Sequence, residues 1–396
     1  MINIYHKEDC MGCSACASVC PKQCISMRSD KEGFVYPTVE KTSCVDCRLC
    51  ERICPILNKK EVAQRGVDVY AAYNKDQATR LSSSSGGLFS ILATILIQCN
   101  GLVFGAMVNE QRAVVHYAIE RLEDMDALRG SKYVQSDING TYVQVKHALE
   151  LDRLVLFSGT PCQVAGLKSF LGKEYEGLIT QDFICHGVSS PMVWEKYVQH
   201  QETKHKAKIV KASFRSKVKG WSKFSMELLF SNQKTYSKTL DKDMMLQFFL
   251  KNYSLRPACY TCQFKGKTHV SDFTLADFWG IEALKPEMDD GKGASIIFVN
   301  TEKAERLFDR IKGEMVVERM EMDAILPYNT AILHAVDAPQ DRQAFFADME
   351  TQNIKKVYKK YCLDPLPKRV IDKIHITLYK LKQKIKRGKA NEFIHK

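Results

Sequence analysis

Two copies of one cysteine motif open the chain and decide how its N-terminal part folds. Residues 10–21 read CMGCSACASVCP, and residues 44–55 read CVDCRLCERICP. Every cysteine of the first copy, together with the proline that follows the last one, recurs at the same spacing in the second copy. This identity of spacing indicates an internal repeat. We therefore expect two similar halves that fold around the same kind of centre.

The spacing C-x-x-C-x-x-C-x-x-x-C-P resembles that of bacterial ferredoxins, in which the fourth cysteine of each run binds the other run's 4Fe-4S cluster. We predict two clusters in a 2x(4Fe-4S) ferredoxin domain at residues 1–58. Zinc is the alternative, but structural zinc sites usually use two spaced pairs and give the third cysteine of each run no role. So short a segment builds little core, so we expect metal binding and folding to be coupled. The predicted ligands are Cys10, Cys13, Cys16 and Cys54 for one cluster, and Cys44, Cys47, Cys50 and Cys20 for the other.

The composition limits what the rest of the chain can be. Its 396 residues suggest two or three folding units, and 45% hydrophobic with 26% charged residues excludes a disordered or fibrous protein. The sequence contains 15 cysteines, and its first residues do not show the pattern of a signal peptide. We therefore expect reduced thiols in a cytoplasmic protein. The apolar stretch 88–97 is too short to cross a membrane, which predicts a soluble protein.

The charge is concentrated at one end. The net charge is +12, and residues 368–396 contain ten Lys and Arg against two Asp and Glu. The remaining chain is close to neutral, which disfavours a specific nucleic-acid binder. In the basic tail, 366–396, apolar residues recur at helical spacing. Such a helix could lie on an anionic membrane or an acidic partner, or could pack on the body with a solvated charged face.

Between the two ends, short apolar runs alternate with helical patterns. Strands are predicted at 67–73, 102–108, 114–119, 153–157, 178–184, 272–279 and 295–300, and helices at 88–97, 142–151, 161–170 and 302–311. A further antiparallel meander is predicted at 208–214, 224–230 and 234–240. The overall fold class is α+β, with a largely parallel or mixed sheet whose faces are covered by helices. A polar, non-periodic segment at 58–66 marks the boundary with the N-terminal module.

Three groups of residues in the body are candidates for chemistry. The first is Ser82-Ser-Ser-Ser-Gly-Gly-Leu88 ahead of an apolar helix, which could cradle the diphosphate of a flavin or nucleotide or could be an ordinary helix cap. No G-x-G-x-x-G occurs, so a Rossmann dinucleotide site has no support. The second is Gly130-Ser-Lys-Tyr-Val-Gln-Ser136, whose Lys132 could meet a phosphate or a reduced flavin, although a lone loop lysine is usually solvated.

The third group consists of four cysteines. Two of them follow predicted strands, in Gly159-Thr-Pro-Cys162 and in Cys185-His-Gly187, and the other two form the pair Cys259-Tyr-Thr-Cys262. A third 4Fe-4S cluster is one interpretation of this set. The alternatives are a zinc site with the same ligands, or a nucleophile pair of Cys162 and His186 with structural cysteines elsewhere. Cys24, Cys99 and Cys362 have no counterparts, and we expect them to be buried.

The ordered series of motifs resembles the coenzyme F420 hydrogenase/dehydrogenase beta-subunit family. The resemblance runs from Cys10 to about Phe346 and includes the paired cluster motifs, the Ser-Ser-Gly-Gly turn, GSKY at 130–133, GTPCQVAGL at 159–167, CHGV at 185–188 and SDFTLADFWG at 271–280. It implies an iron–sulfur flavoprotein with a body at 66–365 that holds FAD, and it favours a cluster at the four body cysteines. It places Ser85, Gly86, Gly87, Lys132, Gly159 and Thr160 near the flavin.

These cofactors would couple one-electron transfer through the clusters to hydride chemistry at FAD. The expected function is an oxidoreductase, and the alternative is a non-catalytic electron-transfer or adaptor subunit of a larger redox complex. His186 and Lys132 are candidates for proton delivery, against a purely structural role for both. The redox partner could be a ferredoxin-like carrier, a deazaflavin such as F420, a nicotinamide or a small organic substrate. The two-cluster module on the same chain departs from the simplest family layout and leaves that partner open.

Overall fold

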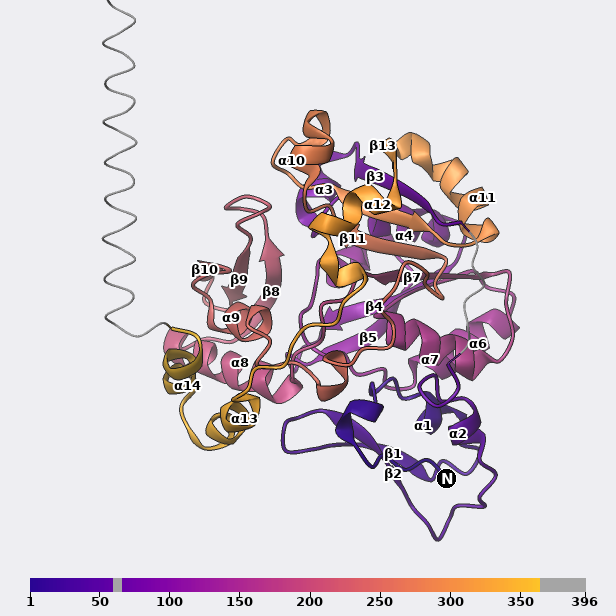
Figure 1. Cartoon of the computed structure of the whole chain (residues 1–396), viewed down its shortest axis with the longest axis vertical. Coiled ribbons are helices and arrows are strands. Elements are labelled where there is room, and N and C mark those ends of the chain that lie inside the picture. The colour runs from indigo at the N-terminus through magenta and orange to yellow at the C-terminus, as the bar shows by residue number, and fades with distance from the viewer. Residues whose placement is uncertain (60–65, 364–396) are drawn as a thin grey trace, which may run out of the picture.

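The computed structural model describes residues 1–59 and 66–363. The predicted basic tail and nearly all of the predicted boundary at 58–66 lie outside these residues. The described chain forms an N-terminal module, a large sheet with helices on both faces, and a smaller lobe beside that sheet (Figure 1). In this part of the chain, no helix combines the length and the apolar character needed to cross a membrane.

The N-terminal module repeats its backbone as it repeats its sequence. Helix α1 (Ala15–Val19) follows Ser14, whose φ is 64°, and helix α2 (Leu49–Arg52) follows Arg48, whose φ is 56°. Each helix therefore starts after a residue in the left-handed region, at equivalent positions of the two motifs. Strands β1 (Ile25–Ser29) and β2 (Val35–Val39) pair as an antiparallel hairpin between them. Cysteines make up much of the interior of this module.

The large sheet has eight strands in the order β13-β3-β12-β11-β7-β6-β4-β5. The neighbouring strands β4, β6, β7 and β11 run parallel, and the outer pairings on both sides are antiparallel. The predicted mixed sheet is therefore present. The strands are β3 (Asp68–Asn74), β4 (Leu102–Val108), β5 (Val114–Ile119), β6 (Val155–Ser158), β7 (Leu178–Phe183), β11 (Phe273–Asp277), β12 (Ser295–Val299) and β13 (Met315–Met320).

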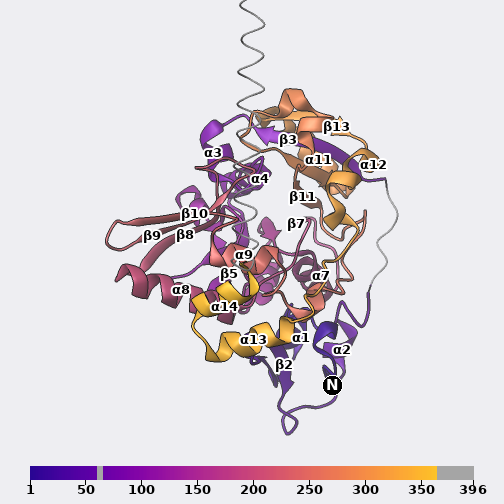
Figure 2. The same cartoon turned by 60° about the vertical axis from the view of Figure 1, so that its left-hand side comes forward.

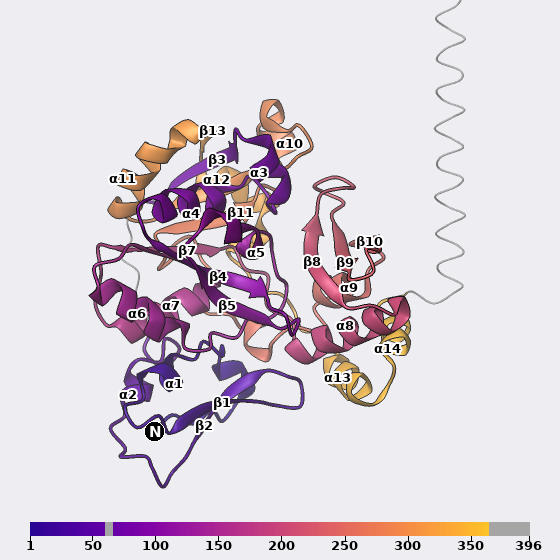
Figure 3. The ribbon, with the colours of Figure 1, turned by 180° about the vertical axis from the view of Figure 1, so that it is seen from behind.

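Helices cover both faces of this sheet, so consecutive residues of strands such as β6 and β12 are buried. On one face, α4 (Leu88–Gln98), α5 (Met125–Leu128) and α11 (Glu302–Ile311) pack on buried strand residues such as Leu156. On the other face, α6 (Thr141–Glu150) and α7 (Pro161–Leu171) pack on β4 and β6, and α10 (Ile281–Leu284) and α12 (Met322–Ile325) pack near β3. The N-terminal module lies against α6 and α7, as the view from behind also shows (Figure 3). The short α3 (Gln77–Ser82) follows β3.

The smaller lobe is built on a three-stranded antiparallel sheet in the order β10-β9-β8, which matches the predicted meander. Its core contains large aromatic side chains, among them Trp194, Phe214 and Phe248. The lobe stands beside the carboxyl-end edge of the large sheet, and α13 approaches the N-terminal module (Figure 2). Its elements are α8 (Pro191–His205), β8 (Ile209–Ser216), β9 (Ser225–Phe230), β10 (Thr235–Thr239), α9 (Met244–Leu250), α13 (Arg342–Thr351) and α14 (Ile354–Tyr361).

Candidate functional site

The parallel strands bring the chemistry-bearing loops to one edge of the large sheet. β6 ends just before Gly159-Thr160-Pro161-Cys162, and β7 ends just before Cys185 and His186. Parallel strands end at the same edge of a sheet, so these two loops lie next to each other. Thr160 caps α7 and Pro161 occupies its first turn, as predicted, which places Cys162 in that turn.

The four body cysteines gather behind this edge. The pKa of Cys162 is raised to about 12, mainly by burial; the hydrogen bond with Thr160 opposes part of this rise, and the neighbouring thiols of Cys262 and Cys259 add to it. Burial also raises the pKa of Cys185 well above its usual range, with the same neighbours and Cys162 adding to the effect. Four partly buried thiols are thus within electrostatic reach of one another. Such a set favours a cationic centre that binds thiolates.

The thiols of the N-terminal module fall into the two predicted groups. Burial raises the pKa of Cys16 to about 12, with Cys10 and Cys54 contributing, so Cys54 lies beside the first motif. Cys20, Cys44, Cys47 and Cys50 line one small cavity. Cys24 lines the same cavity, and its sulfur lies 3.4 Å from that of Cys20. The expectation that Cys24 is buried is correct, and its position beside the second group was not foreseen.

Two further cysteines were expected to be buried, and the structure separates them. Cys362 follows α14 and is buried, as expected. Cys99 is exposed, so that prediction is wrong. It follows Gln98, the last residue of α4, and lies beyond the apolar residues of that helix that pack on the sheet.

No group of three or more His, Cys, Asp or Glu side chains in residues 1–59 and 66–363 is arranged to hold a single metal ion. A cubane cluster places its iron atoms and sulfides between the ligands. Its four thiolates therefore stand farther apart than the ligands of one ion.

The first cysteine group of the module lies directly against the body. A Cβ added at Gly166 of α7 would stand 3.0 Å from the sulfur of Cys13, so any larger residue would press on that thiol. Burial raises the pKa of Cys13 well above its usual range. The nearby thiol of Cys162 adds to this rise, so the two cysteines lie close together. Helix α7 thus carries a body cysteine at its start and touches a module cysteine one turn later.

Arg256 joins the module to the body at the same place. Its guanidinium donates to the carbonyl oxygen of Cys10 at 2.7 Å, to Oε1 of Gln135 at 2.8 Å and to the carbonyl oxygen of Val35 at 3.0 Å. The residue is 1% exposed. Burial raises the pKa of Cys10, and the positive charge of Arg256 opposes part of that rise. The same charge acts on Cys162.

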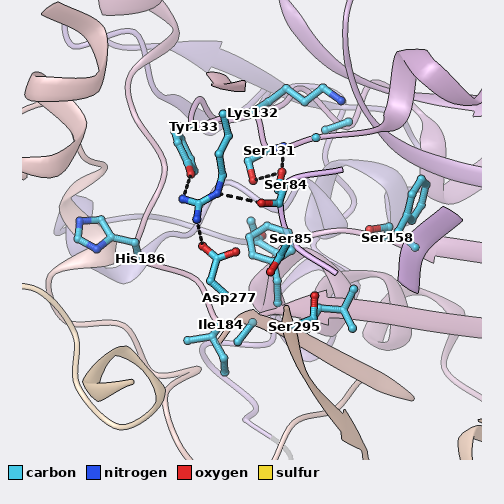
Figure 4. A pocket seen from close by; sticks show the side chains of 18 of the residues that line it. Ser84, Ser85, Ser131, Lys132, Tyr133, Ser158, Ile184, His186, Asp277 and Ser295 are labelled. Atoms are coloured by element: carbon cyan, nitrogen blue, oxygen red, sulfur yellow. Dashed lines mark hydrogen bonds and ion pairs between the residues drawn. The ribbon is translucent and has the colours of Figure 1, made fainter. Parts of the chain in front are cut away.

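A cavity of about 470 Å³ opens at the same edge of the sheet, beside the loops that follow β6 and β7. Its volume is within the size range of ligand pockets. It contains most of the residues that the sequence placed near a flavin. Figure 4 shows Ser85 and Asp277 between His186 on one side and Ser158 on the other. The predicted residues that line it are Ser85, Gly87, Lys132, Gly159, Thr160 and His186.

The serine turn is bonded tightly to the sheet. The Gly86 amide donates to Ser295 Oγ at 2.8 Å, and a Cβ added at Gly86 would overlap the carbonyl oxygen of Ala72. Gly87 precedes α4 with φ 90°, and no side chain caps the helix. The serine hydroxyls bond elsewhere, Ser85 Oγ to the carbonyl oxygen of Ala294. The turn is therefore not a serine-capped helix start, and the first-turn amides of α4 have no side-chain acceptor.

The two predicted proton carriers have different surroundings. Lys132 Nζ donates to the carbonyl oxygens of Ala127 and Arg129 at 3.0 and 2.8 Å, and desolvation lowers its pKa to about 7. His186 shares a 2.7 Å hydrogen bond with Asn252 Oδ1, and burial lowers its pKa. Because Oδ1 can only accept, His186 Nε2 carries the proton of this bond.

Several cavity residues carried no signal in the sequence. Arg215 of β8 forms a 2.8 Å ion pair with Asp277 and also donates to the carbonyl oxygen of Ser84 and the hydroxyl of Tyr133. Burial raises the pKa of Asp277, and the charge of Arg215 opposes this rise. Gln181 of β7 lines the cavity with its Oε1 buried and unpartnered.

Comparisons with known proteins agree with this architecture. Residues 152–324 match the family model for the C terminus of the beta subunit of coenzyme F420 hydrogenase/dehydrogenase, and residues 9–57 match the model of a 4Fe-4S dicluster domain. The chain joins such a dicluster domain to the C-terminal domain of that beta-subunit family. The resemblance noted in the sequence is thereby confirmed, and the N-terminal module is an iron–sulfur domain.

A solved structure of the F420-reducing NiFe hydrogenase complex from Methanosarcina barkeri includes a polypeptide to which this chain is similar. The identity is 14%, the TM-score is 0.44, and the match covers 76% of this chain and 94% of that chain. No curated protein matches the sequence.

Proposed function

We propose that the protein is an iron–sulfur flavoprotein oxidoreductase that couples one-electron transfer through 4Fe-4S clusters to hydride chemistry at FAD. The observation that carries this proposal is the position of the four body cysteines between the cavity and the dicluster module. Thr160 lines the cavity two residues before Cys162, and Cys162 lies close to Cys13. The second cysteine group of the module follows beyond the first. The redox centres would therefore form one series through the molecule.

The body cysteines fit a third 4Fe-4S cluster. Cys162, Cys185 and Cys259 are partly buried thiols whose pKa values are raised by burial and by the neighbouring thiols of the set, which includes Cys262. A cluster takes four thiolates, so it would remove the cost of leaving these groups without partners. The zinc alternative would use the same ligands and is decided by the metal analysis below.

The cavity fits FAD on three observations. The uncapped start of α4, with Gly86 and Gly87 in front of it, offers main-chain amides to a diphosphate. The unpartnered Gln181 Oε1 is a buried acceptor that a ring N–H would satisfy. The volume of about 470 Å³ suits a large planar ligand. Bound there, FAD would exchange a hydride with a substrate and single electrons with the clusters.

The residues of the chain itself would bind, orient and move protons. Arg215 and Asp277 hold the serine turn and Tyr133 in place, which keeps the shape of the cavity. Asn252 fixes the ring of His186 at the cavity wall, so His186 is our candidate for exchanging a proton at that wall. Lys132, with its lowered pKa and its two carbonyl partners, is the second candidate. The substrate would be a hydride donor or acceptor such as a deazaflavin, a nicotinamide or a small organic molecule.

Anaerobic purification with analysis of iron, acid-labile sulfide, zinc and flavin tests the proposal. We expect about twelve iron per chain, since each cubane holds four, and one FAD. Cys162→Ser and Cys259→Ser should each lower the iron content by about four, whereas Cys99→Ser, at an exposed cysteine after α4, should not. Zinc in place of iron at the body cysteines would refute the third cluster. Clusters without flavin would instead support an electron-transfer subunit.

A further inference from the structure

A chain of hydrogen bonds runs from the cavity wall to the sulfur of Cys162. His116 bonds through Nε2 to the carbonyl oxygen of Ser158 at 3.1 Å and through Nδ1 to Ser136 Oγ at 2.9 Å. Ser136 Oγ accepts from Gln163 Nε2 at 3.0 Å. Gln163 Oε1 accepts from the Thr160 amide at 3.0 Å. The Thr160 hydroxyl lies 3.1 Å from Gln163 Oε1 and also 3.1 Å from Cys162 Sγ.

The donors and acceptors of this chain follow from chemistry. A carbonyl oxygen can only accept, so His116 Nε2 is the donor to Ser158. In a neutral imidazole Nδ1 then accepts, and the Ser136 hydroxyl must be its donor. The Ser136 oxygen can then accept the hydrogen bond from Gln163 Nε2. With Nε2 bound to Ser136, the amide oxygen Oε1 of Gln163 faces Thr160. In this series of hydrogen bonds, the hydroxyl proton of Thr160 has two possible acceptors at equal distance, Gln163 Oε1 and Cys162 Sγ.

We propose that Thr160 is a positioning residue that donates its hydroxyl hydrogen bond to Cys162 Sγ and thereby raises the reduction potential of the cluster held there. The inference rests on the third cluster of the proposed function. A ligating thiolate carries negative charge, and hydrogen bonds to charged acceptors are about twice as strong as neutral ones. The sulfur therefore outcompetes the neutral Gln163 Oε1, which keeps the Thr160 amide as its donor.

The direction of the effect follows from charge. A reduced cluster has one more electron than an oxidised cluster, so a donor aimed at its sulfur stabilises the reduced form more. Thr160 also lines the cavity, so the tuned sulfur belongs to the cluster nearest to the ligand site. Electrons leaving the cavity would therefore meet a centre that is easier to reduce than it would be without this hydroxyl.

An ordinary helix cap is the competing explanation. Thr160 and Gln163 form a capping box at the start of α7, and a capping role alone would account for the threonine. The two roles predict different results. A lost cap lowers stability and leaves potentials unchanged, whereas a lost O–H···S bond shifts one potential. Thr301 is a matched control, because it caps α11 and its hydroxyl also donates to a side chain, Asp272.

The test is a redox titration of the full-length holoprotein followed by electron paramagnetic resonance. In Thr160→Val we expect the equilibrium between reduced and oxidised forms of one cluster to shift about tenfold toward oxidised, which is about 59 mV lower for one electron. Thr160→Ser should keep the wild-type value, and the two dicluster potentials should stay fixed in every variant. Thr160→Gly, which loses the hydroxyl but keeps a tolerated cap, should repeat the shift if the valine variant does not fold.

Two results would overturn the inference by different routes. If three cluster potentials are present and none moves in Thr160→Val or Thr160→Gly, the hydroxyl does not tune the cluster, and the proposed function stands. An equal shift in Thr301→Val has the same meaning, because the effect would then come from general destabilisation. If the wild-type protein has only the two dicluster potentials, the third cluster is wrong and the inference falls with it.

Discussion

Replacing Arg256 with methionine should loosen the dicluster module from the body. The side chain is almost completely buried and donates three hydrogen bonds, two of them to main-chain carbonyls of the module at Cys10 and Val35. Its ring contacts are also in the module, with the guanidinium 4.4 Å from the centre of Tyr36. Methionine keeps the apolar stem and removes the charge and every donor. Arg256→Lys keeps the charge and loses the planar fork.

The size of the effect follows from the bonds. Hydrogen bonds to a charged group contribute about 1.5–3 kcal/mol each, so the two that reach the module contribute about 3–6 kcal/mol together. The third, to Gln135, lies within the body. The methionine also avoids the desolvation of a buried cation, which offsets part of this loss. A net loss of about 3 kcal/mol, the lower end of this range, allows for that offset. At about 1.4 kcal/mol per factor of ten, the module should open roughly 100-fold more often.

Hydrogen exchange measured by mass spectrometry on the holoprotein checks this value. Amides near the contact, around residues 10–13 and 33–36, should exchange roughly 100-fold faster in Arg256→Met, while the core of the large sheet should not change. Arg80→Met is the matched control. Arg80 is equally buried and pairs with Asp290, but its hydrogen bonds go to the body loop that contains Asp290 and Gly293 instead of the module. Unchanged exchange at the module contact in Arg256→Met, or the same increase in Arg80→Met, would refute this account of the docking.

Three further predictions concern single positions. Gly166→Ala should displace Cys13 and lower the iron content or the electron-transfer rate of the module, although alanine has a helix propensity about 1 kcal/mol better than glycine. A wild-type cluster spectrum together with wild-type electron-transfer rates would contradict this prediction. Gly86→Ala should weaken FAD retention and lower stability by about 1–3 kcal/mol, since its Cβ would overlap Ala72; flavin content and thermal unfolding measure both effects. The free energy of unfolding should rise with pH from about 7 toward the ordinary lysine range more in the wild-type protein than in Lys132→Met. The unfolded lysine stays protonated there while the folded one, with its pKa lowered to about 7, has released its proton; equal slopes in the two proteins would contradict this assignment.

The parts of the fold that the sequence predicted are those with a dense local signal. The predicted strands at 102–108 and 114–119 and the predicted helix at 302–311 coincide with β4, β5 and α11. The strand β13 (Met315–Met320) was not predicted, because the run is short, only its first and last residues are buried, and two charged, exposed residues lie between them. The helix α8 (Pro191–His205) was also missed, because polar residues dominate it and its apolar stripe is narrow.

In the candidate site too, some residues could be predicted from local sequence patterns and others could not. Strand ends and a C-x-x-C pair were enough to predict that Cys162, Cys185, Cys259 and Cys262 lie together. Arg256 could not be anticipated, because its partner Cys10 lies 246 residues away in sequence. Arg342 of α13 bonds to Glu32 of the module across 310 residues. A lone arginine carries no pattern, and only the folded chain shows what it reaches. The roles of Lys132 and His186 stay predictions.

The contacts of Arg256 and Arg342 have a kinetic consequence. Arg342 holds Glu32 with two hydrogen bonds of 3.0 and 2.6 Å, and Arg256 holds the cysteine loop, so the dicluster domain is clamped at two separate points. Under the proposed function, electron transfer between this domain and the body would be a unimolecular event. Its rate constant should be independent of how dilute the sample is, whereas delivery by a freely diffusing carrier slows in proportion to dilution.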